Sequence, residues 1–407
     1  MGRLVLDVTP LRGRAFRYVF IARTVAVFGL GFAMVAVPLQ VYSLTGSTVG
    51  VASVSVAVGV AAFVGTLLGG VLADRADRRR VILVARSAAG LAFAVLAVNA
   101  ALPEQHLWVI YLCGMVEGIA DGVSGTALMA ATPGLVAHDK LPAAGALLAL
   151  MADLGSATAP ALGGLLVTAT DFWVNYAVCA GAGVITVSCL TRLPSMPATE
   201  AARSETVLQS LGAGIRFVSR DRIVGPALLV GVIAMVLSGW SVLLPEYGEH
   251  VLKVGPEGLG LLYAAPAIGA LIGSLTSGWT GTVRRTGALA IGAVLVSAVG
   301  LATTGLGGGL IWALVGLAVF GIGRLAGDVL RFTIVQENTP DQFRGRVAGL
   351  WTAQVTTGIA LGAAVAGGIS TVASPRDTFV LYAAIGVVST LVAAMTLPTL
   401  RRLVRSL

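Results

Sequence analysis

The chain has 407 residues, of which 57 % are hydrophobic and 11 % are charged, and its net charge is +8 at pH 7. Soluble domains carry roughly 25 % charged residues, so these few charges could not cover so apolar a core, and a water-soluble fold is excluded. The composition instead predicts a bundle of transmembrane helices.

The predicted elements, in chain order, are twelve long apolar runs. A helix that crosses a membrane needs about 20 mainly apolar residues, and unbroken runs of that length favour helices over barrel strands. We expect the spans to be 18–43, 48–72, 81–101, 107–131, 142–168, 172–193, 223–245, 257–279, 287–307, 310–336, 346–372 and 378–398. The sequence therefore predicts an all-α membrane protein.

The basic residues lie mostly on one side of these spans. The N-terminus, the 75–80 turn, the 194–222 segment and the C-terminus share that side, whereas Lys253 and Arg376 fall on the other. By the positive-inside rule, both termini are cytoplasmic. This asymmetry accounts for the net positive charge, so we expect no nucleic-acid partner.

The polar break at 194–222 indicates a linker between two halves. Its apolar residues recur at helical spacing: Val207, Leu211, Ile215 and Val218. This pattern beside arginines favours an amphipathic cytoplasmic helix, although a plain linker fits nearly as well. The expected domains are an N-terminal six-helix half, 1–193, this linker, and a C-terminal six-helix half, 223–407.

The two halves carry matching markers in the same order and at nearly constant offset. The pairs are Gly70 and Gly278, Pro133 and Pro340, and Gly164 and Gly368. This indicates a parallel duplication of a six-helix unit, an arrangement found in transporters that bind their substrate at the interface of the repeats.

A charged bend, "GGVLADRADRRRVI", covers residues 69–82 between the second and third spans. Asp74 lies where the second helix ends, and an acid is mildly unfavourable at the negative end of a helix dipole, so it is expected to need a partner. Asp77 is placed to cap the third span, because Asp accepts backbone N–H bonds at a helix start.

Several motifs resemble a known family. The pattern G-x-x-x-D-R-x-x-R-R-R at 70–80 is similar to the signature of the major facilitator superfamily, with Asp77 where Gly is usual. "GSATAPALGG" at 155–164 resembles the helix-five motif of exporters in that superfamily, with Ala159 where Gly is usual. "VFIARTVAVFGLGF", "TALMAATPGLV", "LYAAPAIGALIGSLTSG" and "GRVAGLWTAQ" together resemble the bacterial enterobactin exporters.

This resemblance implies an antiporter of the bacterial inner membrane that exports a siderophore, an enterobactin-like catecholate, in exchange for protons by alternating access. It also implies a cytoplasmic gate, in which Asp74 latches the halves through nearby arginines and the start of the eleventh span. The gate residues are Gly70, Asp74, Arg75, Arg78 and Arg79. The alternative for Asp74 is an exposed acid in a basic loop.

Five charged residues lie well inside the predicted spans: Glu117, Asp121, Asp153, Arg324 and Asp328. Such a charge costs about 2.5–3.5 kcal/mol at a helix centre. We therefore expect these side chains to face a cavity or one another.

Glu117 and Asp121 are four residues apart and share one helix face. Two carboxylates in a poorly solvated place resist ionising together, so one of them could carry a proton. Alternatively, both pair with arginines and hold the halves together. Asp153 and Asp328 are further candidates for proton coupling.

Arg324 and Asp328 are also four residues apart, and Arg331 follows three residues later, where it could snorkel toward the cytoplasm. An acidic fourth span and an arginine-bearing tenth span could pair across the halves. Alternatively, Arg324 and Asp328 neutralise each other within one helix. The substrate-binding candidates are Arg23, Tyr263, Arg324, Arg331 and Gln354.

Small residues and a proline occur in the fifth span: Gly155, Pro160, Gly163 and Gly164. Glycine permits close helix approach, and proline can bend a helix. We expect these residues to pack the halves tightly together.

Other functions remain open. One alternative is a multidrug or antibiotic efflux transporter, and one from another class is a membrane sensor or scaffold that does not transport. Intramembrane carboxylates favour transport, and no nucleophile–base arrangement or phosphate-binding loop suggests an enzyme. We expect no cofactor, no metal and a monomer. Its partners would be protons, the lipid bilayer and a small siderophore or drug-like substrate.

Overall fold

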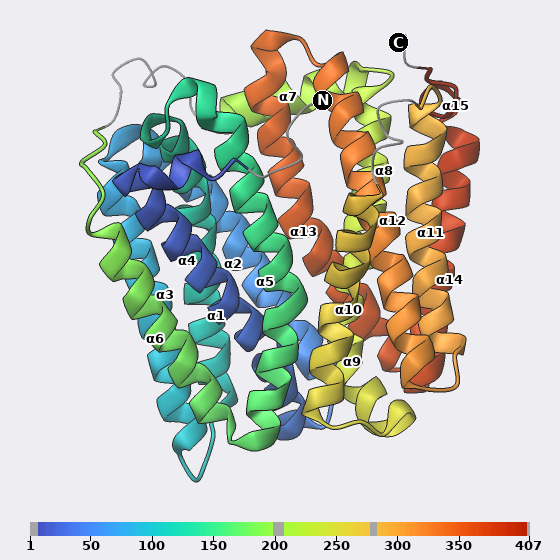
Figure 1. Ribbon diagram of the computed structural model, residues 1–407. Coiled ribbons are helices and arrows are strands. Elements are labelled where there is room, and N and C mark those ends of the chain that lie inside the picture. The colour runs from blue at the N-terminus through green and yellow to red at the C-terminus, as the bar shows by residue number, and fades with distance from the viewer. Residues whose placement is uncertain (1–6, 198–206, 277–282, 405–407) are drawn as a thin grey trace. The chain divides into compact units, whose positions relative to one another are not determined.

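The computed structural model describes residues 7–197, 207–276 and 283–404. Within these ranges the chain is helical and contains no strand. Twelve helical segments of this described part are long and apolar enough to cross a membrane (Figure 1). The predicted all-α fold with twelve spans is confirmed.

The spans follow the predicted runs to within a few residues. The first six are α1 (Arg14–Thr45), α2 (Thr48–Arg75), α3 (Arg78–Ala101), α4 (Leu107–Ala131), α5 (Leu141–Ala169) and α6 (Phe172–Leu190). The last six are a composite span (Val224–Leu252), α10 (Pro256–Leu275), α11 (Thr286–Leu306), α12 (Leu310–Asn338), α13 (Arg344–Ser370) and α14 (Pro375–Thr396). Shorter helices are α7 (Val207–Arg220), α9 (Leu244–Tyr247) and α15 (Pro398–Arg401).

The sequence predicts one regular helix for the seventh span, but the structure shows a composite of several helical segments. Its first helix, α8 (Val224–Leu237), continues as a 3-10 helix over Ser238–Leu243, then as α9, and ends in a π turn over Gly248–Leu252. A Cβ on Gly239 would lie under 3.0 Å from the backbone of Gly362 in α13. The irregular stretch therefore lies where two backbones approach closely.

The chain divides into two compact units, each described by itself. Unit 1 comprises Met1–Gln40 and Val60–Glu205, and unit 2 comprises Val41–Gly59 and Thr206–Leu407. The predicted boundaries of the two halves and their linker stay a prediction. Of the repeat markers, Gly278 lies outside the described residues.

Within unit 1, α3 lies against both α4 and α6. Glycines bring α2 and α4 into backbone contact. A Cβ on Gly65 would lie under 3.0 Å from the backbone of Ile119, and a Cβ on Gly122 would lie equally close to the backbone of Ala62. The backbone contact at Gly122 fixes the rotation of α4, and hence the direction of the carboxylates it carries.

Within unit 2, α12 packs against α10 and α11. Glycines again make the contact: Gly269 on α10 faces the backbone of Ala318, and Gly321 on α12 faces the backbone of Pro266. The pairs α2–α4 and α10–α12 are equivalent in the predicted duplication. In both pairs, glycines bring the two helix backbones into contact, which is consistent with two similar halves.

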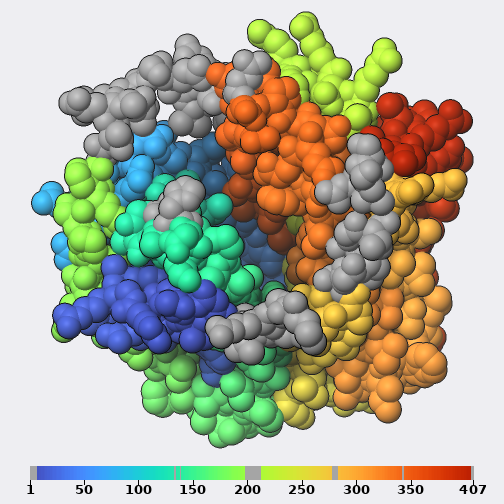
Figure 2. Space-filling model, turned by 45° about the horizontal axis from the view of Figure 1, so that its top comes forward, coloured from blue at the N-terminus to red at the C-terminus, as the bar shows by residue number. Residues whose placement is uncertain are grey.

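Helix α7 lies at the surface of unit 2, where Figure 2 shows its yellow-green side chains. Phe217 of α7 stacks on Phe343, with ring centroids 4.5 Å apart and planes 9° apart. Arg216 and Arg220 are exposed. The helix therefore docks through an aromatic contact and keeps these arginines at the surface.

Candidate functional site

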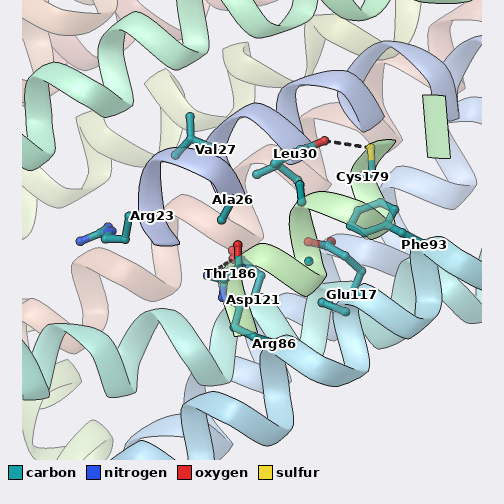
Figure 3. A pocket seen from close by; sticks show the side chains of 15 residues that line it. Arg23, Ala26, Val27, Leu30, Arg86, Phe93, Glu117, Asp121, Cys179 and Thr186 are labelled. Carbon is teal, nitrogen blue, oxygen red and sulfur yellow. Dashed lines mark hydrogen bonds and ion pairs between the residues drawn. The ribbon is translucent and has the colours of Figure 1, made fainter. Parts of the chain in front are cut away.

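A small pocket lies inside unit 1, between α1, α3, α4 and α6 (Figure 3). Its volume is about 150 Å³. The charged residues that line it are Arg23, Arg86, Glu117 and Asp121. The pocket thus collects two cations and two carboxylates from three spans, as expected of charges that avoid lipid.

Glu117 and Asp121 both reach this pocket from one face of α4, as their spacing predicted. Arg86 of α3 donates from Nη2 to Oδ1 of Asp121 at 3.1 Å, and Figure 3 shows this pair with Glu117 beside it. Among the described residues, Glu117 has no ion pair. One carboxylate of the pair is therefore neutralised by a cation, and the other is not.

Arg86 is the residue of this pocket that sequence reasoning missed. It lies five residues inside the predicted third span, so it carried the same signal as the other intramembrane charges. Its partner Asp121 comes from another helix, and no sequence spacing shows that pairing. The ion pair lies within unit 1.

The rest of the pocket wall ties α6 to α1. The Cys179 thiol donates to the carbonyl oxygen of Gly29 at 3.2 Å, and the Thr186 hydroxyl donates to that of Ala22 at 3.3 Å. Arg23 also lines the pocket from α1, and it is exposed. Its guanidinium is thus the accessible positive charge of this wall.

The glycines of α5 face α1. A Cβ on Gly155 would lie under 3.0 Å from the Val27 side chain, and a Cβ on Gly163 would lie 2.9 Å from the Cα of Phe32. This close packing lies within unit 1, whereas the sequence had suggested packing between the halves.

The other candidates on α5 do not line the pocket between α1, α3, α4 and α6. Pro160 and Gly164 are buried in the same helix. Asp153 is half-buried and already engaged with a neighbour. Its role in proton coupling stays a prediction.

Unit 2 contains a second charged cluster, on α12. Asp328 pairs with two arginines of its own helix, Arg324 at 3.4 Å between Nη1 and Oδ2, and Arg331 through Nη2 and Oδ1. The pairing of Arg324 and Asp328 within one helix was one of the two expected alternatives. An ion pair across the halves stays a prediction.

Arg331 corrects one prediction. The sequence suggested that it could snorkel toward the cytoplasm, but Arg331 is 0 % exposed. Its guanidinium carbon lies 5.1 Å from the centroid of the Trp351 ring, and the side chain presses on Gly231 of α8, where a Cβ would clash. The snorkelling prediction failed because a partner acid, an aromatic ring and a glycine together accommodate the charge inside the unit.

Gln354 lies beside Arg331, also against Gly231. Both atoms of its amide are buried and, like Nε and Nη1 of Arg331, have no hydrogen-bond partner among the described residues. Such groups are costly to bury unpaired, so this cluster lowers the stability of the unit.

Tyr263, another substrate-binding candidate, is buried in unit 2. Its hydroxyl donates to the carbonyl oxygen of Ser241 at 3.0 Å. Its ring centroid lies 6.4 Å from that of Trp240. The hydroxyl is thus already bonded to the irregular part of the seventh span.

The charged bend between α2 and α3 is held by Asp77 and the arginines that follow it. Asp77 caps α3, as predicted, by accepting the backbone N–H of Arg79 at 2.9 Å. It also accepts the Ser195 hydroxyl at 2.5 Å and the Met196 N–H at 3.1 Å. These hydrogen bonds, above all the one from Ser195, hold the pKa of the Asp77 carboxyl below its usual value.

The arginines of the bend differ in their surroundings. Arg78 donates to the carbonyl oxygens of Ala73 and Ala130, and Arg79 donates to that of Thr191. Asp74 and Arg75 are exposed, and Asp74 makes no ion pair within the described ranges.

Gly70, the first residue of the proposed gate, lies one turn before Asp74 in α2. A Cβ there would meet no atom within 4 Å. Packing among the described residues therefore gives no reason for a glycine at this position.

Comparison with known proteins identifies relatives along most of the chain. A family model described as the Major Facilitator Superfamily matches residues 19–350. The enterobactin exporter EntS of Shigella boydii serotype 18 is 41 % identical over 361 residues, which cover 89 % of this chain and 86 % of that protein. The enterobactin exporter EntS of Escherichia coli O139:H28 is 40 % identical over the same shares.

Solved structures with a similar fold are also transporters. A crystal structure of a variant of the nucleoside transporter NupG has a TM-score of 0.78 at 13 % identity, and covers 94 % of this chain and 99 % of that one. The POT family transporter PepTSo has a TM-score of 0.77 at 12 % identity, and covers 96 % of this chain and 98 % of that one. At these identities the likeness shows the fold alone.

Proposed function

Because this chain belongs to the Major Facilitator Superfamily, we propose that it exports a catecholate siderophore resembling enterobactin across the inner membrane, by proton antiport with alternating access. The chain is a membrane transporter rather than an enzyme. The observation that carries the choice of substrate is the identity with enterobactin exporters along most of both chains.

The unit 1 pocket supports the proton half of the proposal. Glu117 and Asp121 face the same small space, and Arg86 pairs with Asp121. A proton that binds Asp121 would release Arg86, and a proton that leaves would restore the pair. Such an exchange couples the charge of the pocket to proton uptake.

The expected energy source can be tested in everted membrane vesicles, in which the cytoplasmic face of the membrane is exposed to the medium. A proton gradient should drive uptake of the siderophore, and a protonophore should abolish it. Siderophore uptake that does not depend on the gradient would contradict antiport. Uptake of unrelated apolar drugs instead would favour the multidrug alternative, and no transport at all would favour a sensor or scaffold.

The residues that carry the proton can be identified in the same vesicles. Glu117→Gln and Asp121→Asn remove one ionisable group each while keeping the side-chain shape, and at least one should lose gradient-driven uptake. Glu104→Gln, at an exposed position after α3, is the matched control. Full uptake by both pocket variants would exclude these two residues as essential carriers.

The bend between α2 and α3 is the proposed cytoplasmic gate. The hydrogen bonds of Arg78 and Arg79 support a rigid turn, from which Asp74 and Arg75 are exposed. Asp74→Asn should therefore change both the transport rate and the cytoplasmic accessibility of cysteines introduced near the gate. If neither changes, Asp74 is an ordinary exposed acid.

A further inference from the structure

The charged cluster on α12 contains one acid and two bases. Asp328 pairs with both Arg324 and Arg331, so among these three side chains one positive charge is in excess. Among the described residues, neither arginine has an ion-pair partner other than Asp328, so no second acid offsets this excess. A net charge inside a membrane span is costly, and an anion that binds beside it would offset that cost.

Arg324 is the cation that can receive such an anion. Arg331 is buried and fixed between Asp328, Trp351 and Gly231. The Arg324 side chain, by contrast, is 39 % exposed. Its distance of 3.4 Å to Asp328 exceeds the roughly 2.7–2.9 Å of a strong charge-assisted hydrogen bond.

Arg324 lines a pocket whose other walls are aromatic and apolar apart from Asp328, its own ion-pair partner, and Thr333. The pocket has a volume of about 360 Å³. It is lined by Met235, Arg324, Asp328, Val329, Phe332, Thr333, Trp351 and Val355. Its polar groups are few and lie together, which is the arrangement that orients a small ligand.

Two rings form one side of this pocket. The centroids of Phe332 and Trp351 lie 5.7 Å apart, with planes at 79°, an edge-to-face contact. Arg331 lies over the Trp351 ring and holds it in place. Arg331 is thus a positioning residue, because it acts through Trp351 and Asp328 and is itself closed off from the pocket.

We infer that this pocket binds an anionic aromatic group, with its ring against Trp351 and Phe332 and its negative oxygens on Arg324. The inference rests on the proposed function, in which the group is one catecholate arm of the exported siderophore. The volume lies at the low end of the roughly 300–1,000 Å³ typical of small-molecule sites, so it suits one arm rather than a whole siderophore.

The test is calorimetric titration, near neutral pH, of the full-length, detergent-purified chain with 2,3-dihydroxybenzoate, a small catechol whose carboxylate stands in for the negative oxygens of a catecholate. Cyclohexanecarboxylate keeps the anion without the aromatic ring, and catechol, which is uncharged at this pH, keeps the ring without the anion. Dihydroxybenzoate should bind about tenfold more tightly than either, because it satisfies both Arg324 and the rings. Equal affinity for dihydroxybenzoate and cyclohexanecarboxylate would overturn the inference.

Variants locate the site. Arg324→Gln and Trp351→Leu should each weaken binding about tenfold, as expected for loss of a charge or an aromatic wall. Trp312→Leu, at an exposed position in the first turn of α12, should leave it unchanged. Since Trp351→Leu removes a contact of Arg331 and could unfold the unit, Val329→Trp provides a second route: it fills the pocket from a position 38 % exposed. Unchanged binding in Val329→Trp would overturn the inference.

The binding inference and the proposed transport function can be disproved independently of each other. If dihydroxybenzoate binds as expected but vesicles transport no siderophore, the proposed function is wrong and the aromatic-anion site stands. If vesicles transport the siderophore equally well with Val329→Trp and Arg324→Gln, the site is not part of the transport path and the inference is wrong.

Discussion

Asp77 shows how one departure from a family pattern is accommodated at the residue scale. Its carboxylate caps α3 and also binds Ser195 and Met196, which follow α6. Glycine, usual at this position in the signature, could make none of these side-chain hydrogen bonds. The acid therefore connects two segments that are far apart in the sequence.

Asp77→Ala should lower the free energy of unfolding by about 1–2 kcal/mol, because a capping bond and further hydrogen bonds are lost. The measurement is the thermal unfolding of the purified chain in detergent. Asp171→Ala is the control, since Asp171 precedes α6 in the same capping position but makes no side-chain capping bond. Equal effects of the two variants would contradict the role of Asp77.

The stability that Asp77 supplies should depend on pH. Its pKa is lowered in the folded chain, so its contribution is fully present above the unfolded value of about 3.9 and is lost as pH falls through the folded value. The difference in unfolding temperature between the wild type and Asp77→Ala should be constant from about pH 5 to 7 and shrink below about pH 4. If this temperature difference instead grew at acidic pH, the pKa of Asp77 would be raised by folding, and the prediction would be wrong.

The ion pair between Arg86 and Asp121 leads to a prediction about the stability of single and double variants. Arg86→Gln leaves Asp121 without its cation, whereas the double variant Arg86→Gln/Asp121→Asn leaves no charge behind. The single variant should be the less stable of the two, by about 1–3 kcal/mol, because an unpaired charge in a span costs more than a neutral pair. Unfolding temperatures of the single and double variants give the comparison, and a double variant less stable than Arg86→Gln would refute it.

At the scale of elements, glycines decide how closely the spans approach. The same device joins α2 to α4, α10 to α12 and α1 to α5. Small residues substitute here for the hydrophobic driving force, which is weak between helices in lipid. The helix contacts are therefore sensitive to single methyl groups.

Gly163→Ala and Gly145→Ala form a matched pair on α5. A Cβ at Gly163 meets the Phe32 backbone, so alanine there should destabilise the chain by about 1–3 kcal/mol. A Cβ at Gly145 meets nothing within 4 Å, so alanine there should be neutral or stabilise by up to about 1 kcal/mol. Thermal unfolding in detergent measures both, and equal shifts would show that the α1–α5 contact is not tight.

At the scale of the whole molecule, the spans were predictable because a bilayer demands long apolar helices. The fourth span, 107–131, matches α4 at both ends. The side-chain pairings were less predictable, because they depend on which helices become neighbours. The burial of Arg331 requires Trp351 and Gly231, which come from two other helices, so spacing along α12 alone suggested snorkelling instead.

A deletion strain tests the function of the whole chain. Under iron limitation, a strain that lacks this protein should accumulate a catecholate siderophore inside the cell, because the route outward is lost. Mass spectrometry of washed cells measures the accumulation, and expression of the wild-type chain or Glu104→Gln should reverse it. Normal internal levels would contradict siderophore export.

The bond between Asp77 and Ser195 has a consequence for the order of synthesis. The two residues are 118 positions apart, and the chain between them forms α3 to α6. When α3 first leaves the ribosome, Asp77 can already cap it, but Ser195 and Met196 do not yet exist. The acid can take its final partners only after α6 has been made. The hydrogen bonds of Asp77 to Ser195 and Met196 can therefore form only once the whole stretch from α3 to α6 has been synthesised.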